Sequence, residues 1–443
     1  MKVDSVRNAA VGVLLRVFEH GAYLNRALDA AVNREKPGER GRRFLTQLVY
    51  GTVRHKLLCD HVLAKRVRQP LDDLPRPILA VLRMGVFQSL FCAQVTHPAM
   101  VHTSVDLARR FGHAGTARLV NAVLRRVPQS IEDVPFPGLA QDPVGYLSAR
   151  YSMPRWLVER WLDERGAGGA EAVCAAYNTE APTTLRANTL KTSAEVLAAR
   201  LNAGGWVAAP GPPVPELVTL AGGPSLVRSK LFRQGDFVIE DAASMLPPHL
   251  LEPKAGERVL DMCAAPGVKT THVAQLAEGR AVVVAMDVHP GKLRLVGQNA
   301  ARLGTPGIVR VCSDGTQPGL VPGFDRVLVD APCSGLGTLR RRPDLKWRAT
   351  PDLPGRLSGL QQSLLRSAIG ICKNGGVIVY SVCTFSPEET DDVIGACLGE
   401  GRVEPEDGPQ WLTPWKTDQG RYRTDPQNGG WDGFFLMRLR KVC

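Results

Sequence analysis

The sequence lacks the features of a membrane or secreted protein. Its longest obvious apolar run, residues 281–286, is far shorter than the ~18 residues that a membrane-spanning helix needs. Residues 1–7 contain no apolar core of a signal peptide. Hydrophobic residues make up 44% and charged residues 22% of the 443 positions, which excludes disorder as the main state. We therefore expect a cytoplasmic protein of two to four domains, since a domain averages about 150 residues.

The ten cysteines also lack a metal-binding pattern. None lies in a Cys-x-x-Cys pair, and no His-x-x-x-His partner is present, so we expect no metal. In a reducing compartment they are free thiols, and most should be small buried hydrophobes. A reactive cysteine must therefore be identified from its surroundings.

Positive charge is abundant but unevenly placed. The net charge is +12; residues 1–128 hold 21 Lys/Arg against 9 Asp/Glu, and the remaining residues hold 34 of each sign. Such a basic segment predicts a polyanionic partner, nucleic acid first, although a merely solvating surface explains the charge alone equally well.

Apolar periodicity divides the chain into four parts. Residues 1–128 show helical spacing with Lys and Arg between the apolar positions, which predicts an all-helical bundle. Residues 129–144 are interrupted by prolines and indicate a linker. Residues 145–235 mix helix and strand patterns, which predicts a small α+β module. In residues 236–443 short apolar strands alternate with helices, as in a doubly wound, mainly parallel sheet.

Aspartates end four of the five predicted strands of this last part. One such residue is most simply a helix cap, but ligands of an open parallel sheet bind beyond the carboxyl ends of its strands. The first strand leads into small residues and a helix N-terminus, without the glycine framework of a Walker loop. Asp287 lies 20 residues after Gly267, the distance at which an acidic residue commonly binds the hydroxyl groups of a ribose. The pattern favours a phosphate-free nucleoside, of which S-adenosylmethionine is the commonest. The four aspartates are Asp261, Asp287, Asp314 and Asp330.

Two cysteines follow the fourth and fifth strands. Cys333 lies in Asp330-Ala-Pro-Cys-Ser-Gly, and Cys383 lies in Tyr380-Ser-Val-Cys-Thr. Either alone is more simply a buried core residue. At neighbouring strand ends of a nucleoside-binding sheet, the two together predict reactive thiols.

These motifs resemble the RNA cytosine-5 methyltransferase family, and residues 1–128 resemble a NusB-type RNA-binding domain. The fusion resembles bacterial small-subunit ribosomal RNA enzymes of the RsmB/Sun/Fmu type over nearly the whole chain. Departures are Val268, Val382 and Glu240, where the family usually has Gly, Thr and Gln. The other matching segments are Cys263-Ala-Ala-Pro-Gly-Val-Lys-Thr, Phe232-Arg-Gln-Gly-Asp-Phe-Val-Ile-Glu-Asp, Trp431-Asp-Gly-Phe-Phe, Val81-Leu-Arg-Met-Gly-Val-Phe-Gln and Leu119-Val-Asn-Ala-Val-Leu-Arg.

The resemblance implies a multidomain fold: an all-α NusB-like bundle, a small α+β RNA-binding module and an α/β Rossmann-like methyltransferase sheet. It implies methyl transfer from S-adenosylmethionine to carbon 5 of a cytosine in small-subunit ribosomal RNA, by a monomer without metal. Cys383 would be the nucleophile, Cys333 would assist product release, Asp330 would hold the base, and Lys269 would support the thiolate. The cofactor would contact Cys263, Ala264, Ala265, Pro266, Gly267, Val268, Lys269, Asp287, Asp314 and Asp330.

A target base must leave its stack to reach a buried thiol, so we expect a single-stranded or loop cytosine. The basic segment after Cys333 offers phosphate contacts and a stacking tryptophan, although a solvated surface with a core tryptophan is the alternative. The expected RNA contacts are Arg340, Arg341, Arg342, Lys346, Trp347 and Arg348.

Three other functions remain open at this point. A transfer-RNA methyltransferase would use the same chemistry. A non-catalytic RNA-binding or assembly factor could carry a relic domain, although both cysteines and all four aspartates are present. A DNA cytosine methyltransferase would need one catalytic Pro-Cys and a large recognition domain, and would have no use for Cys383.

Overall fold

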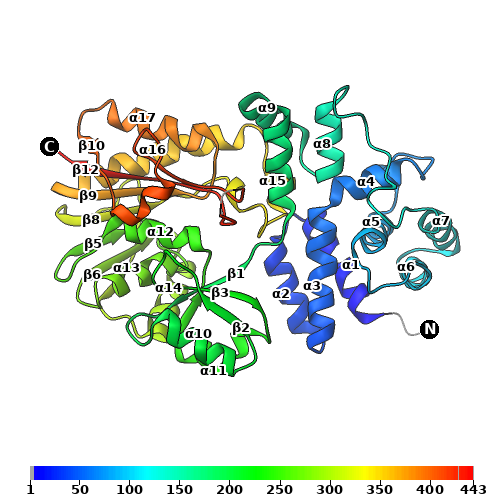
Figure 1. The fold of residues 1–443 in the computed structure, drawn as a ribbon, viewed down its shortest axis with the longest axis horizontal. Helices are drawn as coiled ribbons and strands as arrows, with labels where there is room; N and C mark the ends of the chain where they lie inside the picture. The colour runs from blue at the N-terminus through cyan, green and yellow to red at the C-terminus, as the bar shows by residue number, and fades with distance from the viewer. Residues whose placement is uncertain (1–3, 428, 443) are drawn as a thin grey trace. The chain divides into compact units, whose positions relative to one another are not determined.

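The computed structural model describes residues 4–427 and 429–442. The chain forms two compact units (Figure 1). The first comprises Met1–Thr179 with Leu339–Ala349, and the second comprises Glu180–Thr338 with Thr350–Cys443. No described helix is both long enough and apolar enough to cross a membrane.

The first unit is helical because its apolar residues recur at helical spacing. Helix α5 (Arg76–Phe91) lies at the centre, and every residue from Ile78 to Gln88 is buried. Helix α3 comes so close to it that a Cβ at Gly51 would lie 1.9 Å from the Phe87 ring. The other helices are α1 (Ser5–Phe18), α2 (Leu24–Glu35), α3 (Glu39–Arg54), α4 (Lys56–Ala64), α6 (His97–Phe111), α7 (Ala114–Leu124), α8 (Pro143–Tyr151) and α9 (Arg155–Asn178).

Helices α8 and α9 belong to this first unit, although we expected residues 145–235 to form one module. Trp161 and Leu157 of α9 are fully buried, and α8 packs on α4. The Leu57 amide donates a 2.8 Å hydrogen bond to the Ser152 hydroxyl, which follows α8. Apolar surface on these helices is therefore buried within the helical unit.

A segment from the second half of the sequence completes the first unit. Helix α15 (Leu345–Arg348) lies in it, and Lys346 is 1% exposed. Its ammonium donates to the Asn178 side-chain oxygen at 2.8 Å and to the Ser152 carbonyl at 3.3 Å. The Trp347 indole donates to the Val53 carbonyl at 2.8 Å. These contacts fasten residues 339–349 to the helices.

The second unit begins with a four-stranded antiparallel sheet in the order β2-β3-β1-β4. Alternating buried residues such as Leu185, Ala187 and Phe237 pack it against α10 (Ala194–Ala203). Its strands are β1 (Thr183–Ala187), β2 (Val207–Pro210), β3 (Leu217–Gly222) and β4 (Phe237–Ile239), and α11 (Lys230–Gln234) precedes β4.

The larger sheet of this unit has the order β10-β12-β9-β8-β5-β6-β7, with β11 paired to β12. Strands β5 to β9 are parallel, and β12 is antiparallel to β9. This confirms the predicted fold class, a helical bundle followed by a small α+β module and a Rossmann-like sheet. The strands are β5 (Arg258–Asp261), β6 (Val282–Asp287), β7 (Ile308–Cys312), β8 (Phe324–Asp330), β9 (Cys372–Val382), β10 (Val403–Pro405), β11 (Tyr422–Thr424) and β12 (Phe434–Lys441).

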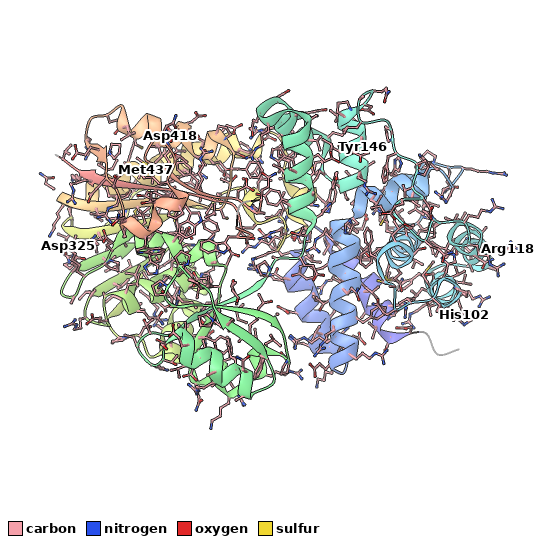
Figure 2. The ribbon with its side chains drawn as sticks, viewed as in Figure 1. His102, Arg118, Tyr146, Asp325, Asp418 and Met437 are labelled. Carbon is pink, nitrogen blue, oxygen red and sulfur yellow. The ribbon has the colours of Figure 1, made fainter. Side chains whose placement is uncertain are left out.

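Helices before, between and after the parallel strands cover the larger sheet, and Met437 of β12 lies among its packed side chains (Figure 2). The sheet order reverses at β5, whose neighbours are β6 and β8. Ligands of such sheets bind at that reversal, beyond the carboxyl ends of the strands. The helices are α12 (Ala242–Leu251), α13 (Val268–Leu276), α14 (Pro290–Leu303), α16 (Leu353–Ile371) and α17 (Asp391–Leu398).

Replacing Trp347 tests the fastening of α15. We expect Trp347→Ala to cost about 3 kcal/mol, because a partly buried indole packed against the core and its hydrogen bond to Val53 are lost. Hydrogen exchange should show faster opening of α3. Arg342→Ala is the matched control, since Arg342 is exposed on the same segment; equal exchange in both variants would contradict the assignment.

Candidate functional site

The two predicted thiols meet at the carboxyl edge of the larger sheet. Strands β8 and β9 are parallel and pair Asp330 with Ser381, so the loops after them start side by side. The Gly337 amide donates to the Cys383 carbonyl at 2.9 Å, which joins the two loops. The sulfur atoms of Cys333 and Cys383 lie 3.2 Å apart. The sequence predicted both cysteines at one site, and the structure brings them together.

A half-buried ion pair lies beside the thiols. The Lys269 ammonium, from the first turn of α13, is 2.8 Å from one carboxylate oxygen of Asp330. The Ser381 hydroxyl donates to the other oxygen at 2.8 Å. Burial alone would lower the pKa of Lys269, but Asp330, Glu240 and Cys383 outweigh it, so the net pKa is raised. The ammonium therefore stays charged where it interacts with Cys383.

The Cys333 thiol holds its proton tightly. The pKa of Cys333 is raised well above its usual value, because its thiol is hydrogen-bonded to Cys383 and is buried. Charge on Cys383 and on Glu389 raises it further. The Cys333 thiol therefore stays protonated and can donate a hydrogen bond to a Cys383 thiolate.

Glu389 holds the two cysteine loops together, and sequence reasoning missed it. It is fully buried, and its carboxylate accepts hydrogen bonds from the Ser334 amide at 2.8 Å and from the Ser334 hydroxyl. Gln361 donates to it at 3.1 Å. The Ser334 hydroxyl also contacts the Thr384 hydroxyl at 2.9 Å, next to Cys383. The two strand-end loops thus share one buried hydrogen-bond network.

The loop after β5 forms the other half of the site. Gly267 has φ +95°, and a Cβ there would lie 2.9 Å from the Val296 Cα, so the turn requires glycine. The Ala264 amide donates to the Met286 carbonyl at 2.9 Å, which places the segment Cys263 to Gly267 between β5 and β6. Burial raises the pKa of the Cys263 thiol, so it behaves as an apolar group.

The strand-end aspartates occupy different environments. Asp261 is 1% exposed; one carboxylate oxygen accepts from Thr270 at 2.6 Å, and the other has no partner among the described residues. Asp287 is buried and accepts the His289 amide at 2.8 Å. Asp314 is exposed and accepts from the amide and hydroxyl of Thr316, which lower its pKa.

A second ion pair, which is fully buried, contacts the segment that follows β5. Arg186 of β1 is 2.6 Å from Glu240, and both side chains are buried. The guanidinium also donates to the Val268 carbonyl at 2.8 Å and to the Thr271 hydroxyl at 2.9 Å. Glu240 is one of the departures noted in the sequence, and its charge pairs with Arg186. No sequence pattern indicated Arg186, because the contact spans 54 residues.

The predicted RNA contacts after Cys333 are only partly on the surface. Arg340 and Lys346 are buried, which contradicts their interpretation as phosphate contacts, because their charged groups lie inside the first unit. The Trp347 indole nitrogen is bonded to Val53, so this residue fits the alternative of a core tryptophan. Arg341 is half-buried, and Arg342 and Arg348 are exposed, so for these three RNA contact stays a prediction.

The pKa of Asp261 makes stability depend on pH. Burial raises it to about 7, against partial compensation by Thr270, so the folded chain holds a proton that the unfolded chain has lost. Stability should therefore fall between about pH 4 and about pH 7, by up to about 4 kcal/mol. Asp261→Asn should remove this fall. Urea unfolding of both proteins from about pH 5 to about pH 8 measures it; parallel pH profiles would show an Asp261 ionised throughout.

Comparison with known proteins identifies the family. The model for 16S rRNA methyltransferase RsmB/F matches residues 248–440, the NusB family model matches 4–129, and the ferredoxin-like domain model of RsmF/B-like methyltransferases matches 153–226. The probable ribosomal RNA small subunit methyltransferase B of Bacillus subtilis is 35% identical over 100% of both chains. The ribosomal RNA small subunit methyltransferase B of Thermus thermophilus is 36% identical over 100% of this chain and 99% of that protein.

Solved structures agree with this comparison. A methyltransferase homolog protein from Pyrococcus horikoshii is 32% identical, covering 67% of this chain and 98% of that chain with a TM-score of 0.59. The resemblance seen in the sequence is thereby confirmed. The chain belongs to the RsmB/F family of 16S rRNA methyltransferases and carries a NusB-family domain in its N-terminal part.

Proposed function

We propose that this chain transfers a methyl group from S-adenosylmethionine to carbon 5 of a cytosine in small-subunit ribosomal RNA, through a covalent bond to Cys383. The observation that carries the proposal is the pair of sulfur atoms 3.2 Å apart beside the Lys269–Asp330 ion pair. Methylation of a ring carbon explains why two thiols are needed at one site.

Carbon 5 of cytosine is too weak a nucleophile to accept a methyl group directly. Addition of the Cys383 thiolate to carbon 6 turns the ring into an enamine, and carbon 5 can then attack an electrophilic methyl group. Asp330 holds the base at nitrogen 3 or at the amino group. The charged Lys269 favours ionisation of Cys383, because an adjacent cation stabilises a thiolate.

Release of the product needs a base that removes the proton from carbon 5. Cys333 can become that base after Cys383 has bonded to the ring. Its pKa is raised chiefly by the hydrogen bond to Cys383. Once the Cys383 sulfur is bound to carbon 6, it is an uncharged thioether. It then no longer stabilises the protonated form of Cys333. Cys333 then loses its own proton to solvent more readily, and its thiolate removes the proton from carbon 5. The bond between Cys383 and carbon 6 breaks, and its electron pair returns to the Cys383 sulfur.

The residues present fit the methyl donor. The Gly267 turn brings backbone close to a ligand at the helix N-terminus of α13, and Asp261 has a buried oxygen available for a further donor. Residues Cys263 to Lys269 would cradle the donor, with Asp287 on its ribose, Asp314 near its adenine and Asp330 closing the pocket. When bound, S-adenosylmethionine supplies the sulfonium methyl group.

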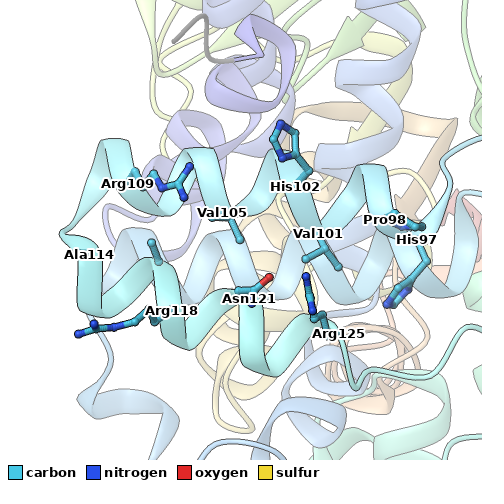
Figure 3. A pocket seen from close by; sticks show the side chains of 11 residues that line it. His97, Pro98, Val101, His102, Val105, Arg109, Ala114, Arg118, Asn121 and Arg125 are labelled. Carbon is cyan, nitrogen blue, oxygen red and sulfur yellow. The ribbon is translucent and has the colours of Figure 1, made fainter.

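RNA would be gathered by a basic groove of the N-terminal unit, between α6 and α7. The groove has a volume of about 660 Å³. No carboxylate is among the described residues that line it, but Asp106 beside it pairs with Arg109 and lies 3.6 Å from His102. Val101 and Val105 contribute apolar lining, and Arg118 and Arg125 follow each other along the α7 side (Figure 3). His102 and Arg118 lie at the surface of the unit (Figure 2). The other polar lining residues are His97, Arg109 and Asn121.

The two cysteine roles predict different effects when each cysteine is replaced by alanine. Cys383→Ala should abolish methyl transfer to undermethylated small-subunit RNA, whereas Cys333→Ala should retain a covalent enzyme–RNA adduct that survives a denaturing gel. Radiolabelled methyl transfer and the gel measure the two effects, with transfer RNA as the competing substrate. An adduct in Cys383→Ala would reverse the assignments. Absence of transfer by the wild-type protein at saturating donor would favour a non-catalytic RNA-binding factor, and preferred methylation of transfer RNA would favour the other substrate.

The groove makes a separate prediction about RNA affinity. Arg118→Ala and Arg125→Ala should each weaken RNA binding and reduce the slope of log K against log salt by about 1, because one phosphate contact is lost. Arg110→Ala is the matched control, since Arg110 is exposed on α6 but does not line the groove. Filter binding across salt concentrations measures all three. The groove assignment fails if Arg110→Ala changes the slope as much as the groove variants do.

A further inference from the structure

A carboxylate and two imidazoles converge inside the second unit, away from the thiol pair in sequence and in their contacts. Glu216 directly precedes β3, His249 lies near the end of α12, and His272 lies in α13. One potential ligand atom from each lies within 4.8 Å of the other two. The cluster escapes a search for short metal motifs, because its members come from three separate elements.

The contacts within the cluster are close. The same Glu216 oxygen, Oε1, lies 2.7 Å from Nε2 of His249 and 2.6 Å from Nε2 of His272. The two imidazole rings meet edge to face with centroids 5.1 Å apart. Glu216 and His272 are 2% and 1% exposed. A single carboxylate oxygen is therefore shared by two imidazoles in a nearly dry environment.

Hydrogen bonding satisfies His272 poorly. Its Nδ1 atom has no hydrogen-bond partner among the described residues, and its Nε2 atom approaches Glu216 at 2.6 Å without well-aligned hydrogen-bond geometry. A buried polar group without a well-formed hydrogen bond is unfavourable, and such groups commonly mark an ion or water site. We therefore expect the Nε2 atom of His272 to bind an ion rather than to share a proton with Glu216.

We propose that Glu216, His249 and His272 bind a divalent transition-metal ion of the zinc class. Two imidazole nitrogens and one carboxylate oxygen are a ligand set that suits Zn²⁺, with a fourth position left for water. Ligand bonds of about 2.0–2.2 Å in tetrahedral arrangement place the ligand atoms roughly 3.3 Å apart. The two distances from Glu216 Oε1, 2.7 Å and 2.6 Å, would therefore each lengthen by roughly 0.6–0.7 Å to admit the ion.

The surrounding charge permits a cation. The neighbouring Arg186 guanidinium is 2.6 Å from Glu240, so its charge is paired. A carboxylate with two neutral imidazoles leaves a divalent ion with a net charge of one. His249 is 11% exposed on its side chain and offers a path for the ion to enter.

The ion would act as a structural clamp rather than in the methyl transfer. It would join the start of β3, the end of α12 and the helix α13. Helix α13 also carries Lys269, and its Thr271 is held by Arg186. The metal would thereby stabilise the helix from which the catalytic ammonium projects.

Cobalt binding to the full-length protein tests the site directly. Cys333 and Cys383 are a competing thiol pair, so the protein carries Cys333→Ser and Cys383→Ser in all samples. After treatment with a chelator, we expect one equivalent of Co²⁺ to bind with visible d–d absorption and without thiolate charge-transfer bands. Zn²⁺ should displace it and raise the unfolding temperature, because it binds only the folded state.

His249→Gln is the informative variant, because His249 is at the edge of the cluster and its replacement leaves the buried Glu216–His272 pair in place. It should lower Co²⁺ affinity at least roughly tenfold and abolish stabilisation by Zn²⁺. His102→Gln, an exposed histidine of the other unit, is the control and should bind as the parent does. No cobalt binding by the parent, thiolate bands, or unchanged affinity in His249→Gln would overturn the proposal.

Discussion

The ion pair between Lys269 and Asp330 fixes the geometry on which the whole site depends. Lys269 opens the helix after β5, Asp330 ends β8, and Ser381 of β9 completes the contact. Three neighbouring strands are thus brought to one point at their carboxyl edge. The side chains are 12% and 28% exposed, so removing one partner would leave the other charge only partly solvated. The pair therefore fixes where the strand ends lie relative to one another, and both cysteine loops begin at those strand ends.

Buried polar contacts repeat this arrangement throughout the second unit. Glu389 ties the two cysteine loops together, and the Arg186–Glu240 pair supports the Val268 loop from the side of the small sheet. Such contacts offer modest net stability, since desolvation offsets much of the attraction. They do restrict where each loop can lie. A reaction that needs a thiol, a second thiol and a carboxylate around one base depends on that restriction.

The excess positive charge and the reactive groups lie in different units. The net charge of residues 1–128 equals that of the whole chain, and the basic groove of α6 and α7 belongs to that segment. Several charged residues of the second unit form internal ion pairs, among them Arg186 with Glu240 and Lys269 with Asp330. Under the proposed function, exposed arginines of one unit would attract RNA, and groups at the sheet edge of the other unit would carry out the chemistry.

Sequence patterns were most informative where the chain is locally regular. Apolar runs marked the strand ends, so Asp330, Cys333 and Cys383 could be placed at one edge from the order of residues alone. Contacts between distant positions left no such signal: Glu389, Arg186 and the Glu216 cluster meet their partners only through tertiary packing. Lys346 shows the same limit, since a lysine in a basic run is typical of a surface, yet carbonyl and amide oxygens from separate helices bury it.

The central claim is that Cys383, and not Cys333, bonds to the base. Small-subunit RNA containing 5-fluorocytidine tests this most directly, because fluorine at carbon 5 cannot leave as a proton and the adduct persists. After incubation of the wild-type protein with this RNA and the methyl donor, mass spectrometry of digested adduct identifies the linked residue. We predict a nucleotide on the peptide that contains Cys383. A nucleotide on the Cys333 peptide, or no adduct at all, would contradict the account.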